Sequence, residues 1–234
     1  MPKDLSENAN WILSHLSTAD ARLLQPRLAR VDLPLRKPLE ASGRPIEHVY
    51  FPESGIVSVV ANGGDKRSIE VGLIGREGMT GLAVVMGTDR SSHHSYVQCA
   101  GSALRMTANH LREAMQESPP LHQRFLLYGH AFLMQTGYTA VANGRSKIEE
   151  RLARWILMAH DRIDGDALAL THEFLATMLG VRRPGVTVAL NLLEGAGVIR
   201  AARGIITIVD RKGLEKLSNG AYGVPEAEFK RLFG

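Results

Sequence analysis

Four arginines concentrate positive charge in one short stretch of the sequence. Residues 181–203 hold these four cations against a single acid, which gives the stretch a net charge of +3. The cations are Arg182, Arg183, Arg200 and Arg203, and the acid is Glu194. A guanidinium group can donate two hydrogen bonds to guanine, and it can also pair with phosphate. Because salt screens charges beyond about 10 Å, this local excess matters more than the chain total. The stretch therefore has the chemistry of a nucleic-acid contact.

Two short helices around a turn are predicted to position these arginines. The first helix lies within residues 171–180, with Thr171 as its N-cap and Gly180 just past its end. Pro184 can open the second helix, since proline fits the first helical turn. The apolar face of the second helix consists of Val186, Ala189, Leu190, Leu193 and Ala196. Two short helices joined by a glycine-containing turn predict a helix-turn-helix.

The opposite face of the second helix has side chains suited to base edges. Thr187, Val188 and Asn191 lie there, and asparagine pairs well with adenine while valine methyls suit a thymine methyl. Segments 198–200 and 205–209 then predict a β-hairpin, with a break at residues 201–204. The hairpin makes the motif a winged helix, whose own arginines could reach flanking phosphates. We expect DNA contacts from Thr171, His172, Arg182, Arg183, Gly185, Thr187, Val188, Asn191, Arg200 and Arg203.

Short β-type segments fill most of the N-terminal half, after a helical lead-in at residues 4–30 in which Ser17 is the expected N-cap. The predicted strands are 31–35, 48–51, 56–60, 68–73, 95–99 and 103–106. Turn signals at Pro52–Gly55 and Asn62–Asp65 separate some of them, and the glycine-rich residues 75–87 are expected to form a loop. This pattern predicts an antiparallel β-roll rather than a parallel sheet, and hence an α+β chain.

A long helix is expected to join the two halves. It covers residues 120–142 after a shorter helix at 107–117, and Asn143-Gly144 is expected to end it, with Ser146 capping a helix at 147–163. One stripe at 4-3 spacing is assigned to a dimer contact. It consists of Leu121, Phe125, Tyr128, Phe132, Gln135 and Thr139. A second apolar set lies beside it, so the helix can pack both on its own domain and on a partner; this set is Leu127, Ala131, Met134, Tyr138 and Val141. The expected domains are a sensor (1–118), a dimerisation helix (119–143) and a DNA-binding domain (144–234).

The totals exclude several classes of protein. No stretch approaches the roughly 18 apolar residues that a membrane span needs, and the N-terminus has no apolar signal core. One cysteine, Cys99, rules out a disulfide within the chain and any cluster that needs several thiolates. A cytoplasmic protein that is not an enzyme is the expectation.

Three segments resemble the Crp/Fnr family of bacterial transcription regulators, and the likeness extends over nearly the whole chain. The segments are Glu150–Leu157, Leu170–Ala176 and Leu179–Val186. The resemblance implies a cyclic-nucleotide-binding-like β-roll, a long dimerisation helix and a winged helix. It also implies a homodimer on a two-fold symmetric operator of double-stranded DNA, contact with RNA polymerase, and a possible small-molecule effector. Arg183 matches a family arginine that typically reads guanine.

The chain departs from the cyclic-AMP-binding members in the effector pocket. Where they have a Gly-Glu pair, Gly81 is followed by Leu82, and their Arg-Ser pair falls near His93-His94. A cyclic phosphate without its arginine loses a charge-assisted pair, so we do not expect cyclic AMP as the effector. Thr136 is a further candidate pocket residue. Pro184 and Val188 replace a Glu and an Arg of the recognition helix, so the operator should differ.

Other interpretations of these residues remain open at this point. His93, His94 and Cys99 could ligate haem or another metal, and Cys99 could act as a redox switch, but the residues favour a polar loop with a small buried thiol. Gly75–Gly81 is glycine-rich but lacks the lysine of a P-loop. No resident cofactor or metal is therefore assigned. The main competing function is a ligand-binding module whose winged helix contacts protein only; a β-roll metalloenzyme is weaker.

Overall fold

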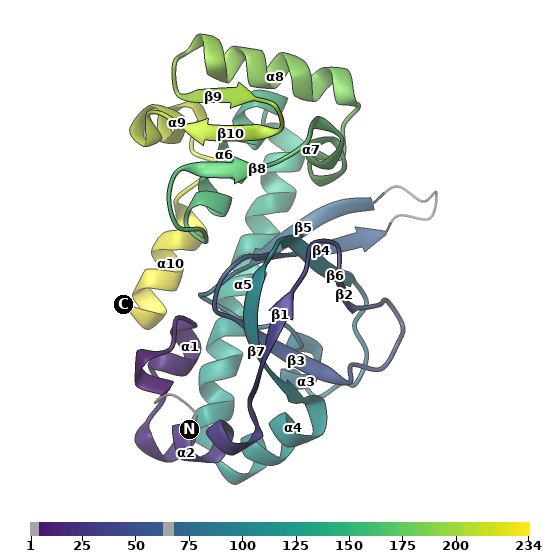
Figure 1. Ribbon diagram of the computed structural model, residues 1–234, viewed down its shortest axis with the longest axis vertical. Coiled ribbons are helices and arrows are strands. Elements are labelled where there is room, and N and C mark those ends of the chain that lie inside the picture. The colour runs from purple at the N-terminus through teal and green to yellow at the C-terminus, as the bar shows by residue number, and fades with distance from the viewer. Residues whose placement is uncertain (1–4, 63–67) are drawn as a thin grey trace. The chain divides into compact units, whose positions relative to one another are not determined.

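The computed structural model describes residues 5–62 and 68–234 (Figure 1). The chain forms two compact units. They are Met1–Val59 with Leu73–Phe132, and Val60–Gly72 with Leu133–Gly234. Strands β4 (Ile56–Asn62) and β5 (Ser68–Ile74) and helix α5 (Pro119–Arg145) each contribute residues to both units. The predicted α+β architecture of β-roll, long helix and winged helix is confirmed, whereas the predicted domain boundaries stay a prediction.

The N-terminal lead-in is helical, as predicted. Its elements are η1 (Leu5–Glu7), α1 (Trp11–Ser14), α2 (Thr18–Leu24) and η2 (Gln25–Arg27). Ser17 caps α2, because its hydroxyl accepts a hydrogen bond from the Asp20 amide at 3.1 Å. Asn10 is fully buried, and its side-chain amide donates to the carbonyls of Pro52 and Gly78. This residue therefore ties the lead-in to the β-roll.

Among the residues that the structure describes, the β-roll contains all six predicted strands and one more. Besides β4 and β5 they are β1 (Ala29–Leu33), β2 (Pro38–Glu40), β3 (His48–Pro52), β6 (His94–Cys99) and β7 (Gly101–Thr107). They form the sheets β1-β7-β3 and β2-β6-β4-β5, and the β1–β7, β3–β7 and β2–β6 pairings are antiparallel. The extra strand β2 is three residues long and starts at a proline. It is therefore too short to show an alternation of apolar and polar residues. The predicted turn at Asn62–Asp65 lies mostly outside the described residues.

A short helix was missed in the glycine-rich segment. Helix α3 (Leu82–Val85) follows Gly81, whose φ of +81° lies in the left-handed region. A Cβ atom at Gly81 would come within 2.3 Å of the Val49 side chain, so only glycine fits here. The glycines that indicated a loop thus allow the chain to turn sharply into a helix.

The long helix extends further than predicted. After α4 (Ala108–Glu117), α5 continues through Asn143 and Gly144 to Arg145, so the predicted interruption is wrong. One glycine inside a helix costs only about 1 kcal/mol, which a long helix tolerates. Helix α6 (Ile148–His160) is capped at Lys147, whose amide donates to the Glu150 carboxylate at 2.9 Å, and not at Ser146.

Most residues of the predicted dimer stripe on α5 are buried within the chain itself. Leu121 and Phe125 are fully buried and Tyr128 almost so, and the Phe125 ring lies 6.2 Å from that of Phe51 in the same unit. Gln135 is also buried, and Phe132 and Thr139 are partly buried. Two adjacent apolar faces made the assignment ambiguous from periodicity alone. The exposed large apolar side chains of α5 are Leu126, Leu127, Leu133 and Val141.

We predict that Leu121→Ala lowers the free energy of unfolding by about 2–5 kcal/mol, because it leaves a cavity in the core. Urea unfolding followed by circular dichroism measures the change. Leu35→Ala is the matched control, since Leu35 is 58% exposed and should change stability by less than about 0.5 kcal/mol. Equal losses in the two variants would contradict the burial assigned to α5.

Candidate nucleic-acid interface

A helix-turn-helix is built as the sequence predicts. Helix α7 (His172–Leu179) starts at Thr171, whose hydroxyl accepts from the Phe174 amide at 3.2 Å, and stops at Gly180 with φ +61°. Helix α8 (Arg183–Gly195) follows, with Pro184 in its first turn. The helices begin and end within a residue of the prediction, because helix caps and the glycine and proline residues at helix ends act over only a few residues.

The buried face of α8 determines which side chains the helix presents to solvent. Val186, Ala189, Leu190 and Leu193 are each at most 2% exposed, and α8 packs against α6 and α7. Gly185 also lies on the α6 side, since a Cβ there would approach Ile148 to 3.2 Å. Gly185 therefore takes part in helix packing, and its predicted DNA contact stays a prediction. Ala196, predicted to be on the apolar face, is instead an exposed C-cap residue.

The outward face of α8 carries most of the predicted base-reading residues. Arg182, Arg183, Val188 and Asn191 are all exposed, and Leu192, which the sequence analysis did not select, is 53% exposed beside them. Leu192 lies one helical turn after Val188, so the 3.6-residue period could have identified it. The helix thus presents two guanidinium groups at its start and a mixed amide and aliphatic surface further along.

Two predicted contact residues form an internal brace between the helices. His172 Nδ1 lies 3.1 Å from the Thr187 hydroxyl, which also donates to the Arg183 carbonyl at 3.3 Å. Together with the Thr171 cap, these contacts hold α7 and α8 at a fixed angle. The polar groups of Thr171 and Thr187 are therefore engaged in the fold.

The wing is a three-stranded antiparallel sheet in the order β8-β10-β9. Its strands are β8 (Ala167–Ala169), β9 (Ile199–Ala202) and β10 (Ile205–Ile208). Only Arg203 and Gly204 form the hairpin loop, so the break is shorter than predicted. Both have positive φ, +50° and +79°, as a type I′ turn requires. Arg200 and Arg203 are exposed, and the Glu194 carboxylate accepts from the Ala201 amide at 3.0 Å.

The four arginines of this surface keep their positive charge available. Within residues 5–62 and 68–234, none of Arg182, Arg183, Arg200 or Arg203 pairs with a carboxylate. Glu194 is nearby in sequence but binds a backbone amide of the wing. Their attraction for a phosphate backbone is therefore not offset by partners on the described part of the protein.

A segment distant in sequence supports the turn of the helix-turn-helix. Glu70 and Trp155 are almost fully buried, and Trp155 Nε1 donates to Glu70 Oε1 at 2.5 Å. The Ile69 side chain lies against Gly180, where a Cβ would meet it at 3.0 Å. Arg151 donates to the Leu179 carbonyl from the other side. All these residues belong to the second unit, and no local pattern could have predicted a contact such as that of Trp155 with Glu70, 85 positions away.

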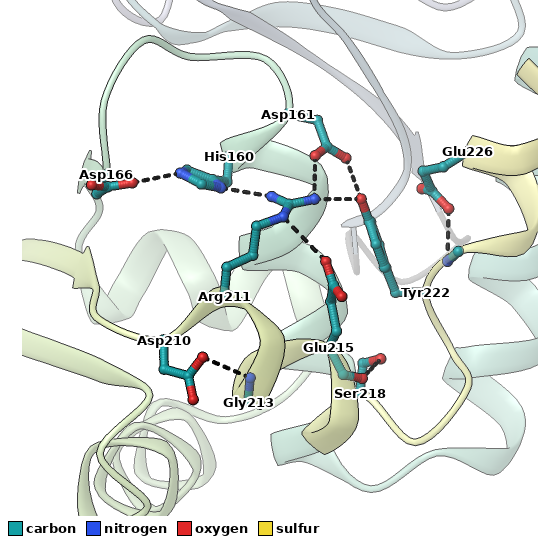
Figure 2. Close-up of polar contacts among 11 residues, drawn as sticks. His160, Asp161, Asp166, Asp210, Arg211, Gly213, Glu215, Ser218, Tyr222 and Glu226 are labelled. Carbon is teal, nitrogen blue, oxygen red and sulfur yellow. Dashed lines mark hydrogen bonds and ion pairs between the residues drawn. The ribbon is translucent and has the colours of Figure 1, made fainter. Parts of the chain in front are cut away.

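A polar network centred on Arg211 joins α9 (Arg211–Leu217) to the end of α6 (Figure 2). Arg211 donates to His160 Nδ1 at 2.6 Å, to Asp161 Oδ1 at 2.7 Å and to the Tyr222 hydroxyl at 2.7 Å. Because arginine only donates, His160 Nδ1 is the acceptor and its Nε2–H donates to Asp166 at 2.9 Å. Burial, together with the nearby Asp161 carboxylate, raises the pKa of Tyr222. The network fixes the base of the wing and precedes α10 (Val224–Phe233).

The candidate effector residues fall in three places. Gly81 and Leu82 lie at the start of α3, while His93 and His94 lie at the start of β6. Thr136 lies in the part of α5 that belongs to the second unit. Within 5–62 and 68–234, no group of three His, Cys, Asp or Glu side chains is placed to hold a metal ion. His94 and Cys99 stand at opposite ends of β6, which keeps them apart.

A carboxylate that the sequence did not indicate, that of Glu40, lies beside Gly81 at the start of α3. Glu40 Oε1 accepts a 2.6 Å hydrogen bond from the Gly81 amide. Burial raises the pKa of Glu40, while hydrogen bonds from Gly81 and Ser91 oppose the rise. Ser95, directly across from Glu40 in the β2–β6 pairing, has a buried hydroxyl. The start of α3 is thus occupied by the protein's own acidic group.

Residues 150–217 match the family described as the Crp-like helix-turn-helix domain. A comparison with curated protein sequences finds no relative. No helix among the described residues is long and apolar enough to cross a membrane.

Solved structures with a similar fold cover most of the chain. A protein assigned to the Crp/Fnr family from Eubacterium rectale is 19% identical, with a TM-score of 0.71 over 92% of this chain and 100% of its own. FixK2 from Bradyrhizobium japonicum is 18% identical, with a TM-score of 0.70 over 81% and 96%. The c-di-GMP responsive global regulator CLP from Xanthomonas campestris is 18% identical, with a TM-score of 0.65 over 82% and 99%. The resemblance drawn from the sequence is thereby confirmed at the level of the fold.

We predict that Glu40→Gln stabilises the protein at pH 7, because glutamine keeps an oxygen for the Gly81 amide and carries no charge at this partly buried site. The raised pKa means that the folded protein binds the Glu40 proton more tightly than the unfolded chain does. The contribution of Glu40 to stability therefore falls as pH rises above the ordinary value of 4.5, and the advantage of the variant should disappear towards pH 4.

Thermal unfolding at pH 4 and pH 7 measures this difference in Tm. Glu117→Gln removes one negative charge at an exposed site and serves as the control. A Glu40→Gln variant less stable than wild type at pH 7 would contradict the assignment.

Proposed function

Since the protein is of the Crp/Fnr type in its fold and in its helix-turn-helix domain, we propose that it is a sequence-specific DNA-binding transcription regulator. It acts as a homodimer on a two-fold symmetric operator and works in the cytoplasm without enzymatic activity. RNA polymerase is its further partner, and a small molecule other than cyclic AMP is its effector.

The observation that carries this proposal is the outward face of the winged helix. Arg182 and Arg183 stand at the start of α8, and two further arginines stand on the wing, all exposed and without carboxylate partners in the described chain. In helix-turn-helix proteins the start of the recognition helix lies nearest the base edges. Arg183 reads guanine, Asn191 reads adenine, and the arginines of the wing contact phosphates on either side.

Glu40 supports an effector other than cyclic AMP. In the cyclic-AMP-binding members, the Gly-Glu pair that falls at Gly81-Leu82 and an Arg-Ser pair together hold the ribose and the cyclic phosphate. Here the Gly81 amide already donates to the Glu40 carboxylate at 2.6 Å. A phosphate at this place would meet a like charge in a poorly solvated site, and no arginine follows at His93 or His94 to offset it.

The homodimer forms along the exposed face of α5 rather than along the stripe predicted from the sequence. Exposed positions recur at 126, 130, 133, 137, 140 and 144, which is the 4-3 spacing of a coiled-coil seam. Leu126 and Leu133 are 44% and 65% exposed, and Val141 beside the seam is 54% exposed. Gly137, Ala140 and Gly144 allow a close approach of two helices at the other end.

The competing function is a ligand-binding module whose winged helix contacts only protein. A protein partner would be expected to cover the exposed aliphatic residues of α8, whereas four unpaired arginines around them favour phosphate. The two functions differ in how salt affects binding, since affinity for DNA falls steeply as salt rises.

We predict that Arg183→Ala weakens binding to operators selected from a random DNA pool by about 1–3 kcal/mol, because a bidentate contact with guanine is lost. Fluorescence anisotropy measures Kd over a series of salt concentrations. Arg44→Ala, which removes another exposed arginine, from the β-roll, is the control and should bind as wild type does. If no DNA is retained even at low salt, the regulator function fails and the protein-only module gains support.

A second prediction concerns assembly. Leu133→Asp should weaken the dimer at least about tenfold, because a carboxylate in an apolar helix seam is desolvated on association. Analytical ultracentrifugation measures the change, and Leu35→Asp, in an exposed loop of the roll, is the control. A monomeric wild-type protein, or a Leu133→Asp dimer of unchanged affinity, would rule out this seam.

A further inference from the structure

Two aliphatic side chains stand on the solvent-facing side of α8. Val188 is 59% exposed and Leu192 is 53% exposed. Being four residues apart, they lie on one face of the helix, one turn from each other. The packing of the helix is already provided by its opposite face, where four apolar side chains are at most 2% exposed. The fold therefore gives no reason for these two residues to be apolar.

One of the two polar residues that adjoin this pair in the sequence, Thr187, is not free to act outward. The Thr187 hydroxyl donates to the Arg183 carbonyl at 3.3 Å and lies 3.1 Å from His172 Nδ1. An incoming surface thus meets the aliphatic groups of Val188 and Leu192, with the Asn191 amide beside them. We name Val188 and Leu192 together the α8 ridge.

The charges around the ridge identify what covers it. Arg182 and Arg183 precede it on the helix, while Arg200 and Arg203 stand on the wing, and none of them is paired with a carboxylate in the described chain. An occupant must therefore be anionic at its edges and apolar between them. The major groove of DNA meets both conditions, since phosphates line its sides and the 5-methyl of thymine is the apolar group on its floor.

This inference rests on the proposed function and deepens it. We propose that the α8 ridge contacts the 5-methyl groups of two thymines in each half-site and so determines part of the operator sequence. Four residues of helix rise about 6 Å, and base pairs stack about 3.4 Å apart. For a helix lying along the groove, the two thymines are therefore about two base-pair steps apart.

Replacing thymine by deoxyuridine tests the contact directly, because uracil keeps the base pair and lacks only the methyl group. Operators selected from a random pool are resynthesised with one such replacement at a time, and Kd is measured for each. Burying a methyl group contributes enough to change Kd about three- to fivefold. We expect a loss of that size at two positions per half-site, about two steps apart.

Variants assign each position to its residue. Val188→Ala should abolish the sensitivity to uracil at one position and Leu192→Ala at the other. Val209→Ala is the matched control, since Val209 is equally exposed at 59% but lies outside α8, and it should retain both sensitivities. All three residues are exposed, so the variants should keep the wild-type Tm.

Each outcome is decisive. If wild-type protein binds the selected operators but no deoxyuridine replacement weakens it, the inference is overturned while the proposed function stands. The same holds if the ridge variants remain as sensitive to uracil as wild type. If no operator can be selected at all, the proposed function itself fails. The measurement on wild-type protein needs no variant, so a misfolded variant would not leave the question open.

Discussion

The packing of α8 on its neighbours is the constraint from which the rest of the surface follows. Four apolar residues of this helix are buried, and their spacing leaves only one rotation of the helix about its axis. That rotation turns Arg183, Val188 and Asn191 outward. The brace between His172 and Thr187 then limits how far α7 and α8 can shift. The buried apolar residues and the residues available for recognition thus lie on opposite faces of α8.

The sequence was most informative where structure is determined locally. Thr171, Gly180 and Pro184 indicated the ends of two helices correctly, because caps and helix punctuation act over a few residues. Ser17 predicted α2 for the same reason. The roll strands were found from their branched and aromatic residues, and only the three-residue β2 escaped.

Properties that depend on long-range contacts could not be predicted in this way. Periodicity showed that α5 has two apolar faces, but choosing the buried one requires knowing that Phe125 meets Phe51. Glu40 looks like an ordinary acid of a short strand until the chain brings it to the Gly81 amide, 41 residues away. The Arg211 network likewise joins residues of α6, α9 and the following loop, which have no common motif.

The tip of the wing links the order of its own backbone to the binding of an anion. Arg203 adopts a left-handed conformation at φ +50°, which costs a residue with a Cβ about 1–2 kcal/mol relative to a right-handed one. The hairpin end is therefore held less firmly than an asparagine-glycine turn would be, and it opens locally at a lower cost than the helices do. An anion that binds the Arg203 guanidinium only when the hairpin is closed would shift this local equilibrium towards the closed hairpin. The end of the wing would then become rigid when it binds the anion. The free-energy cost of ordering its backbone would reduce the net binding free energy.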